Sequence, residues 1–431
     1  MTRRYSAYKD SGVEWIGEIP EHWECLAIRR SSKVKRGASP RPIDDPKYFD
    51  DAGVYSWVRI SDLTASDRYL VETESKLSKL GASLSVKLNE GELFLSIAGS
   101  VGKPIITRIK CCIHDGFVYF ENLNLDAEFL YYIFISGTCF NGLGKFGTQL
   151  NLNTDTIGSI KIPKPTLNEQ SQIVEFLDAK TSLIDRLIDV RQRRIELLKE
   201  KRAALINNAV TKGLDPNVKM KDSGIEWIGE IPEHWEVKKL KYIASITYGI
   251  SPSETTYNDE GVGTVLVNGP VEYSESDFGY TRSLKWTTEP VKFAAKGSLL
   301  FCLRGSTTGR MNITHMDLAI GRGVCAIISK HNQRFLMYSM IMVRMWIQNQ
   351  ISGSTFPSVT KDDVDNISIC TPPSEEQNEI VSFLDQETKK IDDLVALEQK
   401  KIDLLKEYRQ ALISETVTGK KRINGVSSND E

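Results

Sequence analysis

The sequence predicts an α+β protein in which two tandem globular domains alternate with two long coiled-coil helices. Three features support this fold class: a segment near the N-terminus that recurs later, a second repeated segment with heptad spacing, and two intervening stretches of nearly equal length. The 431 residues suffice for two to three domains, and 40% hydrophobic with 26% charged residues is an ordinary globular composition.

Two repeated segments establish an internal duplication. Residues 9–24 return 212 positions later as residues 221–236, with 15 of 16 positions identical. Residues 169–211 return at an offset of 207 as residues 376–418, with 23 identities in 43 positions. Chance does not produce similarity of this length, so the chain is a tandem repeat of one unit.

The stretches between these repeats, residues 25–168 and 237–374, contain 144 and 138 residues and have diverged in sequence. Glycines survive at matching places, as in the runs from Gly37 to Pro40 and from Gly249 to Pro252. Because glycine alone takes positive φ freely, we expect the same turns and one mixed, strand-rich fold with two different surfaces. Strands are expected near residues 54–60, 93–98, 264–267 and 299–303, and short helices at 126–136 and 335–349.

Each unit should end in a long helix. Prolines block helix formation just before both. Thr166 and Glu169 match the capping-box pattern at the first start, and the second start has the same pattern in Ser374 and Gln377. Apolar residues then recur in steps of four and three, the 3.5-residue period of a coiled-coil seam. The predicted seam residues are Ile184, Ile188, Ile195, Leu198, Leu205, Ile391, Val395, Ile402, Leu405 and Leu412.

Charged residues interrupt this seam at Arg191, Arg202, Glu398 and Arg409. The alternative to a coiled coil is two amphipathic helices that lie on their own domains. The patterns divide the chain into a first globular domain, a first helix, a second domain, a second helix and a disordered tail. The corresponding ranges are residues 1–168, 169–214, 215–374, 375–420 and 421–431.

Motifs for catalysis or metal binding are missing from the sequence. The seven cysteines include no C-x-x-C pair, and the five histidines lack ligand spacing. Neither a P-loop nor a G-x-G-x-x-G after a strand is present. A nuclease-like set of Asp44, Glu74 and Lys76 has no counterpart in the second copy. We therefore expect no catalytic residue, no metal and no cofactor in this chain.

Charge and hydropathy indicate location and partners. The longest apolar runs fall short of the roughly 18 residues of a membrane span, and the N-terminus lacks an apolar signal core, which predicts a cytoplasmic protein. Net charge is −2, but residues 25–168 contain 18 basic against 15 acidic residues, and residues 237–374 contain 14 against 11. The two middles are therefore mildly basic, which is compatible with phosphate binding.

The repeated segments also carry a family likeness. Residues 10–23, DSGVEWIGEIPEHW, and their copy at 222–235 resemble the start of specificity (HsdS-type) subunits of type I restriction-modification systems. The runs 169–178 and 376–385 are similar to the start of that family's spacer helices. The likeness covers the whole chain, and its motifs are specific in combination. It implies two target-recognition domains and two long antiparallel coiled-coil spacer helices, related by a pseudo-two-fold repeat.

The resemblance implies a non-catalytic DNA sequence-specificity subunit. Such a subunit reads a bipartite double-stranded DNA target, one half-site per domain, and its spacer helices set the gap. It docks two methyltransferase (modification) subunits that carry S-adenosylmethionine, and the complex can include restriction/translocase subunits that use ATP and magnesium. Near-identical repeats fit docking one partner twice, and divergent middles fit reading two half-sequences.

Polar and basic residues near strand ends and glycine turns are the candidate DNA contacts, because such side chains read bases in the major groove and bind phosphates. Arg59 and Asn268 are expected at equivalent positions after a strand. The candidates in the first domain are Arg36, Ser39, Arg41, Arg59, Ser100, Lys103, Gln149 and Asn151. Those in the second are Tyr248, Ser251, Ser253, Asn268, Arg304, Ser306, Arg310, Arg322 and Thr355.

Two other function classes remain open on the sequence. One is a coiled-coil scaffold that does not bind DNA and carries two protein-interaction domains. The other is an enzyme, such as a fused nuclease or a methyltransferase remnant, against which the missing motifs weigh. DNA binding in the presence of partner subunits distinguishes the first, and activity of the purified chain alone distinguishes the second.

Overall fold

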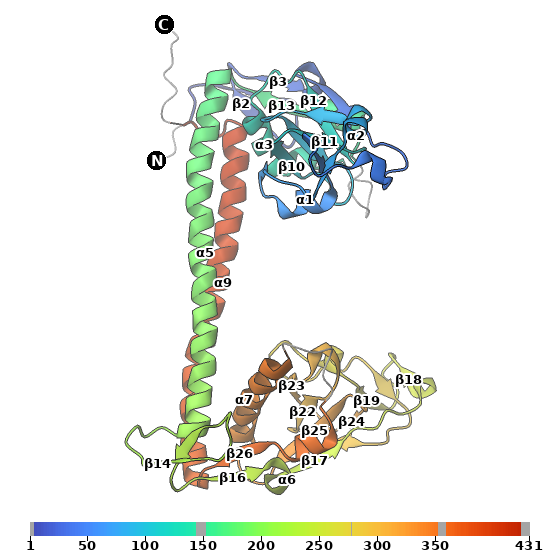
Figure 1. The fold of residues 1–431 in the computed structure, drawn as a ribbon. Coiled ribbons are helices and arrows are strands. Elements are labelled where there is room, and N and C mark those ends of the chain that lie inside the picture. Colours follow the sequence, from blue (N-terminus) through green and yellow to red (C-terminus); the bar gives the residue numbers. More distant parts are fainter. Residues whose placement is uncertain (1–3, 144–151, 277, 352–358, 424–431) are drawn as a thin grey trace. The chain divides into compact units, whose positions relative to one another are not determined.

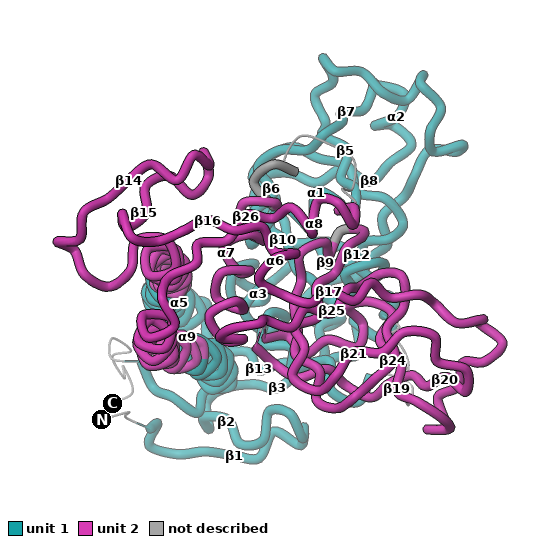
Figure 2. Tube along the Cα trace, turned by 90° about the horizontal axis from the view of Figure 1, so that it is seen from below, with its two compact units in different colours: residues 1–191, 400–431 teal, residues 192–399 magenta. Residues whose placement is uncertain are grey.

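The computed structural model describes residues 4–143, 152–276, 278–351 and 359–423. The chain forms two compact units, residues 1–191 with 400–431 and residues 192–399 (Figure 2). Each unit combines one globular domain with part of both long helices. The tail predicted at 421–431 falls largely outside the described residues, since residues 424–431 are not among them.

The two long helices are α5 (Leu167–Lys212) and α9 (Ser374–Val417), of 46 and 44 residues. At 1.5 Å per residue they are about 69 and 66 Å long. Gly213 and Gly419 follow them with φ of 75° and 73°, the left-handed conformation in which glycine commonly ends a helix. Both helices thus begin and end within three residues of the positions predicted from sequence.

The halves of α5 and α9 that share a unit pack antiparallel (Figure 1). In the first unit, Ile184 and Leu412 are buried in one apolar cluster. In the second, Arg194 contacts Glu398 at 3.4 Å and Arg202 contacts Asp392 at 2.9 Å, so the partner number falls as the α5 number rises. All ten predicted seam residues are buried or half-buried.

Three of the charges that interrupt the seam, Arg202, Glu398 and Arg409, form ion pairs between the two helices. Arg409 Nε lies 2.8 Å from Asp185 Oδ1 in the first unit. The repeat-related pair in the second unit is Arg202 with Asp392. Glu398, only 1% exposed, pairs with Arg194. Since a buried charge without a partner is costly, these residues are compatible with the seam only as pairs.

Two sheets build the globular domain of the first unit. The five-stranded sheet has the order β4 (Lys33–Arg36), β12 (Phe117–Glu121), β9 (Leu93–Ser96), β10 (Pro104–Thr107) and β6 (Tyr69–Leu70). The four-stranded sheet has the order β7 (Ser75–Leu77), β5 (Tyr55–Val58), β11 (Cys111–Ile113) and β8 (Val86–Leu88). Strands β10 and β6, and β11 and β5, are parallel, and the other pairs are antiparallel.

Smaller elements complete the first unit. The two-stranded sheets pair β1 (Tyr8–Asp10) with β2 (Glu18–Pro20), and β3 (Glu24–Ala27) with β13 (Lys161–Lys164). The helices are α1 (Ile60–Ala65), α2 (Lys79–Ser83), α3 (Ala127–Ile135) and α4 (Thr154–Ser159). Helix α3 is apolar on nearly all sides. It lies in the main core, between the five-stranded sheet and α5.

The second unit repeats this plan. Its four-stranded sheet has the order β17 (Ala244–Tyr248), β25 (Val324–Ser329), β22 (Leu299–Cys302) and β23 (Met311–Ile313). Its five-stranded sheet has the order β18 (Tyr257–Asn258), β20 (Trp286–Thr287), β19 (Thr264–Val267), β24 (Leu318–Ile320) and β21 (Phe293–Ala294). The order β17-β25-β22-β23 matches β4-β12-β9-β10, and β19-β24-β21 matches β5-β11-β8. The predicted common fold of the two middles is confirmed.

The remaining elements of the second unit also have counterparts. The two-stranded sheets pair β14 (Met220–Asp222) with β15 (Glu230–Pro232), and β16 (Glu236–Lys239) with β26 (Ser368–Thr371). The helices are α6 (Leu240–Ile243), α7 (Gln333–Ile351) and α8 (Lys361–Asp365). Helix α7, of 19 residues, occupies the place of the nine-residue α3.

A tyrosine and an aspartate join each globular domain to a long helix. Tyr132 Oη donates to Asp178 at 2.5 Å, and Tyr338 Oη donates to Asp385 at 2.6 Å. Burial raises the pKa of Tyr338 to about 12, so the hydroxyl stays protonated and remains a donor. An arginine also binds each aspartate, although Arg68 lies before β6 and Arg334 lies on α7. The same attachment is therefore completed by arginines from different elements.

The two repeated segments meet at the start of each long helix. Trp23 Nε1 donates to Glu169 Oε1 at 3.0 Å, and His22 Nε2 lies 2.8 Å from the same oxygen. His234 and Trp235 contact Glu376 at 2.7 and 2.8 Å. Glu169 also closes the predicted capping box, since its Oε2 accepts from the Thr166 backbone at 3.0 Å. The two repeated segments are therefore linked by the same contact in both units.

We expect Glu169→Gln to destabilise the start of α5 by about 1–3 kcal/mol at neutral pH, because buried donors such as Trp23 Nε1 lose their charged acceptor. Burial raises the pKa of Glu169, but hydrogen bonds from its partners outweigh this and hold it below its ordinary value. The stabilisation is therefore full above the unfolded pKa of about 4.3 and is lost as pH falls through the lower folded pKa. Hydrogen exchange of residues 167–180, corrected for intrinsic rates, measures this opening free energy.

The matched control is Glu175→Gln, which removes an exposed carboxylate from the same helix. Its opening free energy should stay within about 0.5 kcal/mol of the wild type. An equal loss in both variants, or a Glu169→Gln effect that persists unchanged at pH 3, would show that the carboxylate contacts do not stabilise the helix start.

Candidate nucleic-acid interface

The candidate surface in each domain lies where the C-terminal ends of three strands meet. These strands are β4, β5 and β11 in the first domain and β17, β19 and β24 in the second. Gly37 follows β4, and a Cβ there would lie 2.1 Å from the carbonyl oxygen of His114. Gly249 follows β17, and its Cβ would lie 2.1 Å from the carbonyl oxygen of Gly321. Only glycine allows this approach of backbone to backbone. This close approach brings the segment after β4 against the turn before β12, and the segment after β17 against the turn before β25.

The residues that follow β5 and β19 reach the same place. Val58 pairs with Ile113 and Val267 pairs with Ile320, each in parallel register. The predicted equivalence of Arg59 and Asn268 is therefore confirmed. Their surroundings differ, because Arg59 is exposed at the start of α1 whereas Asn268 is half-buried. The same backbone position thus carries the long, charged side chain of Arg59 in the first domain and the half-buried amide of Asn268 in the second.

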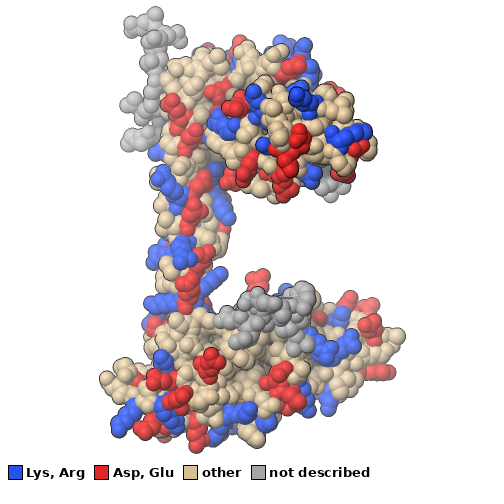
Figure 3. Space-filling model, viewed as in Figure 1, with Lys and Arg blue, Asp and Glu red and all other residues tan. Residues whose placement is uncertain are grey.

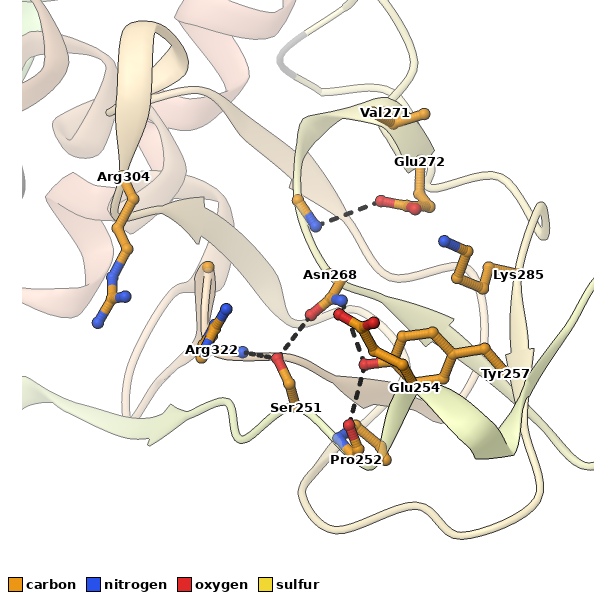
Figure 4. Close-up of a pocket in the computed structure, with 12 residues that line it drawn as sticks. Ser251, Pro252, Glu254, Tyr257, Asn268, Val271, Glu272, Lys285, Arg304 and Arg322 are labelled. Carbon is orange, nitrogen blue, oxygen red and sulfur yellow. Dashed lines mark hydrogen bonds between the residues drawn. The ribbon is translucent and has the colours of Figure 1, made fainter. Parts of the chain in front are cut away.

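In the second domain these ends surround a polar pocket of about 600 Å³ (Figure 4). Four of the predicted residues line it: Ser251, Asn268, Arg304 and Arg322. Ser251 Oγ donates to Asn268 Oδ1 at 3.0 Å and accepts from the Arg322 backbone at 3.1 Å. Asn268 Nδ2 donates to Tyr257 Oη at 3.4 Å. The amide and the hydroxyl are therefore held in place before any ligand arrives.

The pocket also contains charged groups that the sequence pattern did not single out. Glu254, Glu272 and Lys285 line it, and Glu272 accepts from the Gly269 backbone at 3.3 Å. Arg304 and Arg322 are exposed, and within the described ranges their guanidinium groups have no hydrogen-bond or ion-pair partner. No local sequence signal marks the two acids or the lysine, because loop folding alone brings them to the pocket.

The equivalent surface of the first domain is organised by Asp115, which the sequence pattern did not indicate. This residue occupies the turn between β11 and β12, as Arg322 does between β24 and β25. Its carboxylate accepts from Ser39 Oγ at 3.1 Å and from Arg41 at 2.9 Å, and its carbonyl accepts from Arg36. Burial raises the pKa of Asp115, but Ser39 and Arg41 outweigh this and lower it overall. Three predicted residues therefore gather around one acid.

Several other predicted residues bind their own domain. Lys103 Nζ donates to the Ser66 carbonyl at 2.5 Å, and Arg310 donates to the Ser274 carbonyl at 3.3 Å. Tyr248 Oη donates to Asp365 at 2.7 Å. Ser100 Oγ lies 3.5 Å from Thr64 Oγ1, and Ser253 Oγ lies 2.8 Å from Thr255 Oγ1. Outside the described residues lie Gln149, Asn151 and Thr355, as does the side chain of Ser306.

Charge and chemistry limit what these surfaces can do. On the face of the molecule in Figure 3, Lys and Arg are interspersed with Asp and Glu on both units. Within the described part of the chain, no group of three or more His, Cys, Asp or Glu is placed to hold a metal ion. Among the same residues, no helix is long and apolar enough to cross a membrane. The strand-end surfaces are suited to hydrogen bonding with a polar ligand.

Comparisons with known proteins identify the family. Residues 32–199 and 232–407 match the type I restriction modification DNA specificity domain. The chain is 29% identical over 434 residues to the putative type I restriction enzyme MjaX specificity subunit of Methanocaldococcus jannaschii, covering 95% of this chain and 96% of that protein. It is 20% identical over 406 residues to the EcoDI specificity subunit of Escherichia coli, covering 86% and 82%.

Solved structures agree on the fold. The HsdS subunit from Thermoanaerobacter tengcongensis matches with a TM-score of 0.53 and 20% identity, covering 93% of this chain and 98% of that one. A chain from a structure of type I R-M system assembly and conformational transition matches with a TM-score of 0.75, 20% identity and the same coverage. The chain therefore belongs to the type I restriction-modification DNA specificity family and is a non-catalytic specificity subunit.

Proposed function

We propose that each globular domain reads one half of a bipartite double-stranded DNA target. The main support for this proposal is that the two domains share one backbone fold but carry different side chains at the ends of equivalent strands. Asp115 stands in the first domain where Arg322 stands in the second, and Arg59 stands where Asn268 does. Rigid strand ends that present Arg, Asn, Ser and Asp suit the donor and acceptor pattern of base edges in the major groove.

The same chain docks two methyltransferase subunits in this proposal. In the first unit, Leu187 and Val190 of α5 and Leu404 of α9 are exposed although they are apolar. Their repeat counterparts in the second unit, Leu394, Leu397 and Leu197, are exposed as well. Leu187 and Val190 are three residues apart on α5, as Leu394 and Leu397 are on α9, and all six residues lie outside the seam positions. A duplicated apolar stripe fits helices of a partner that binds once per unit.

The proposal assigns all chemistry to the partners. The methyltransferase subunits carry S-adenosylmethionine, and restriction/translocase subunits, where they join, use ATP and magnesium. The complex works in the cytoplasm, where the DNA is. The repeated segments 9–24 and 221–236 support duplicated docking further, since their acidic side chains at Glu14, Glu18, Glu226 and Glu230 are exposed yet identical.

We expect the purified chain to show no methylation, cleavage or ATP hydrolysis, and the assembled methyltransferase to methylate one bipartite motif. The test is sequencing of methylated adenines in DNA treated with the chain alone, the partner alone and both together. Turnover by the chain alone that a point substitution in it abolishes would make it an enzyme. A complex that forms but methylates without sequence preference would favour the scaffold alternative.

A further inference from the structure

We propose that Arg322 fixes one base pair of the half-site read by residues 237–374, by paired hydrogen bonds to a guanine. This assignment rests on the proposed DNA-reading function and names one reader and its base. Arginine matches the O6 and N7 acceptors of guanine with two parallel donors, the commonest specific contact in the major groove.

The backbone that carries Arg322 is fixed from three sides. Its own N–H donates to Ser251 Oγ at 3.1 Å. The preceding Gly321 N–H donates to the Val267 carbonyl at 2.9 Å, and the Leu303 N–H donates to the Gly323 carbonyl at 2.9 Å. Strand β19 and the segments that follow β17 and β22 therefore all hold this turn. A side chain on a fixed turn loses less freedom on binding, which favours a directional contact.

The guanidinium group of Arg322 is available to a ligand. It is exposed at the rim of the pocket and, in the part of the chain that the structure describes, has no hydrogen-bond or ion-pair partner (Figure 4). Asn268 and Ser251 are already bonded to each other beside it. Among the described residues, the acids that line the pocket are Glu254 and Glu272, and Glu272 is engaged by the Gly269 backbone. All five guanidinium donors thus remain for DNA.

The first domain shows that the fold does not require an arginine at this turn. Asp115 takes the same position, and its carboxylate is bound by Ser39 and Arg41. The glycine before each segment approaches the turn equally closely, so the backbone frame is the same in both domains. At this position the two domains share one backbone conformation but carry side chains of opposite charge. The two domains should therefore prefer different bases here. Arg322 therefore belongs to recognition.

The experiment uses the full chain assembled with its methyltransferase subunits. Methylation rates are measured for wild type, Arg322→Ala and Arg322→Lys on the wild-type motif and on every single-base variant of it, at several salt concentrations. We expect both variants to lose about tenfold or more of the preference for guanine at one position of one half-site, with the other half unchanged. Lysine should not restore it, because a point charge lacks the paired donors.

The matched control is Lys296→Ala, which removes an exposed cation at the opposite end of β22. It should leave the motif and the rates unchanged. Uniform weakening by Arg322→Ala across all variants, rescued by lysine, would make Arg322 a phosphate contact and overturn the assignment. Unchanged rates would place it away from DNA and overturn it too. A wild-type complex without any motif would instead overturn the proposed function on which the assignment rests.

Discussion

Replacing residues 237–374 with the corresponding domain of another specificity subunit should change one half of the methylated motif completely and leave the other half and the gap unchanged. The two ends of this segment lie side by side, because β16 pairs with β26 and Val237 stands opposite Cys370. A replacement therefore joins the rest of the chain at one antiparallel strand pair. Most of the apolar core travels with it, since β17, β22 and β25 all lie inside the exchanged segment. Ile206, Trp235 and Ile380 belong to the same core but stay with the rest of the chain, so a replacement domain must pack against them.

A sharper version of this exchange uses the chain's own first domain. Residues 25–168 contain the corresponding strand pair close to their two ends, with Cys25 opposite Pro163. A chain that carries them in both places should methylate a motif in which both halves are the half-site of residues 25–168. Sequencing of methylated adenines gives the motif directly.

The control for these exchanges is reinsertion of the native segment through the same junctions, which should restore the original motif. A change in both halves, or in the gap, would contradict independent reading by the two domains. Loss of all methylation in the exchanged chain while its thermal unfolding stays normal would also count against modular reading.

Patterns that are local in sequence predicted most of the fold. The heptad spacing and the glycines after each helix placed α5 and α9, because helix periodicity and helix ends depend on neighbouring residues. The strand at 264–267 was predicted with its observed bounds, since three of its four residues are β-branched. The structure shows the predicted coiled coil and not the alternative of two separate amphipathic helices. Charged residues that interrupt the seam, such as Arg409, form ion pairs between the helices.

Contacts between distant segments could be predicted only in part. The capping box identified Glu169, but nothing in the sequence showed that His22 and Trp23 reach it across 147 and 146 residues. Asp115 was missed for the same reason. A lone aspartate in a turn has no distinguishing pattern until folding brings Ser39 and Arg41 to it. Lys103 shows the reverse, because a surface-like cation donates to backbone carbonyls of its own domain.

Lengthening both spacer helices by one heptad should lengthen the unread gap while both half-sites stay the same. The insertion duplicates residues 185–191 after Arg191 and residues 393–399 after Gln399, where the two compact units divide. Seven residues keep the 3.5-residue seam in register and add about 10 Å of helix. The added helix length corresponds to an increase of the unread gap by at most about three base pairs, at about 3.4 Å per base pair.

A four-residue insertion near Leu197 in α5 alone provides the contrast. It adds about 6 Å to one helix and rotates the C-terminal part of α5 by about 40° past a full turn, so the seam with α9 no longer matches. We expect this variant to lose methylation or to change the gap without a stable motif, whereas the double heptad insertion keeps activity on a longer site. Methylated-adenine sequencing separates these results. If the double insertion methylates the original motif at the wild-type rate, then the helices do not set the distance between half-sites, because a rod that determines a distance cannot grow by a heptad without changing it.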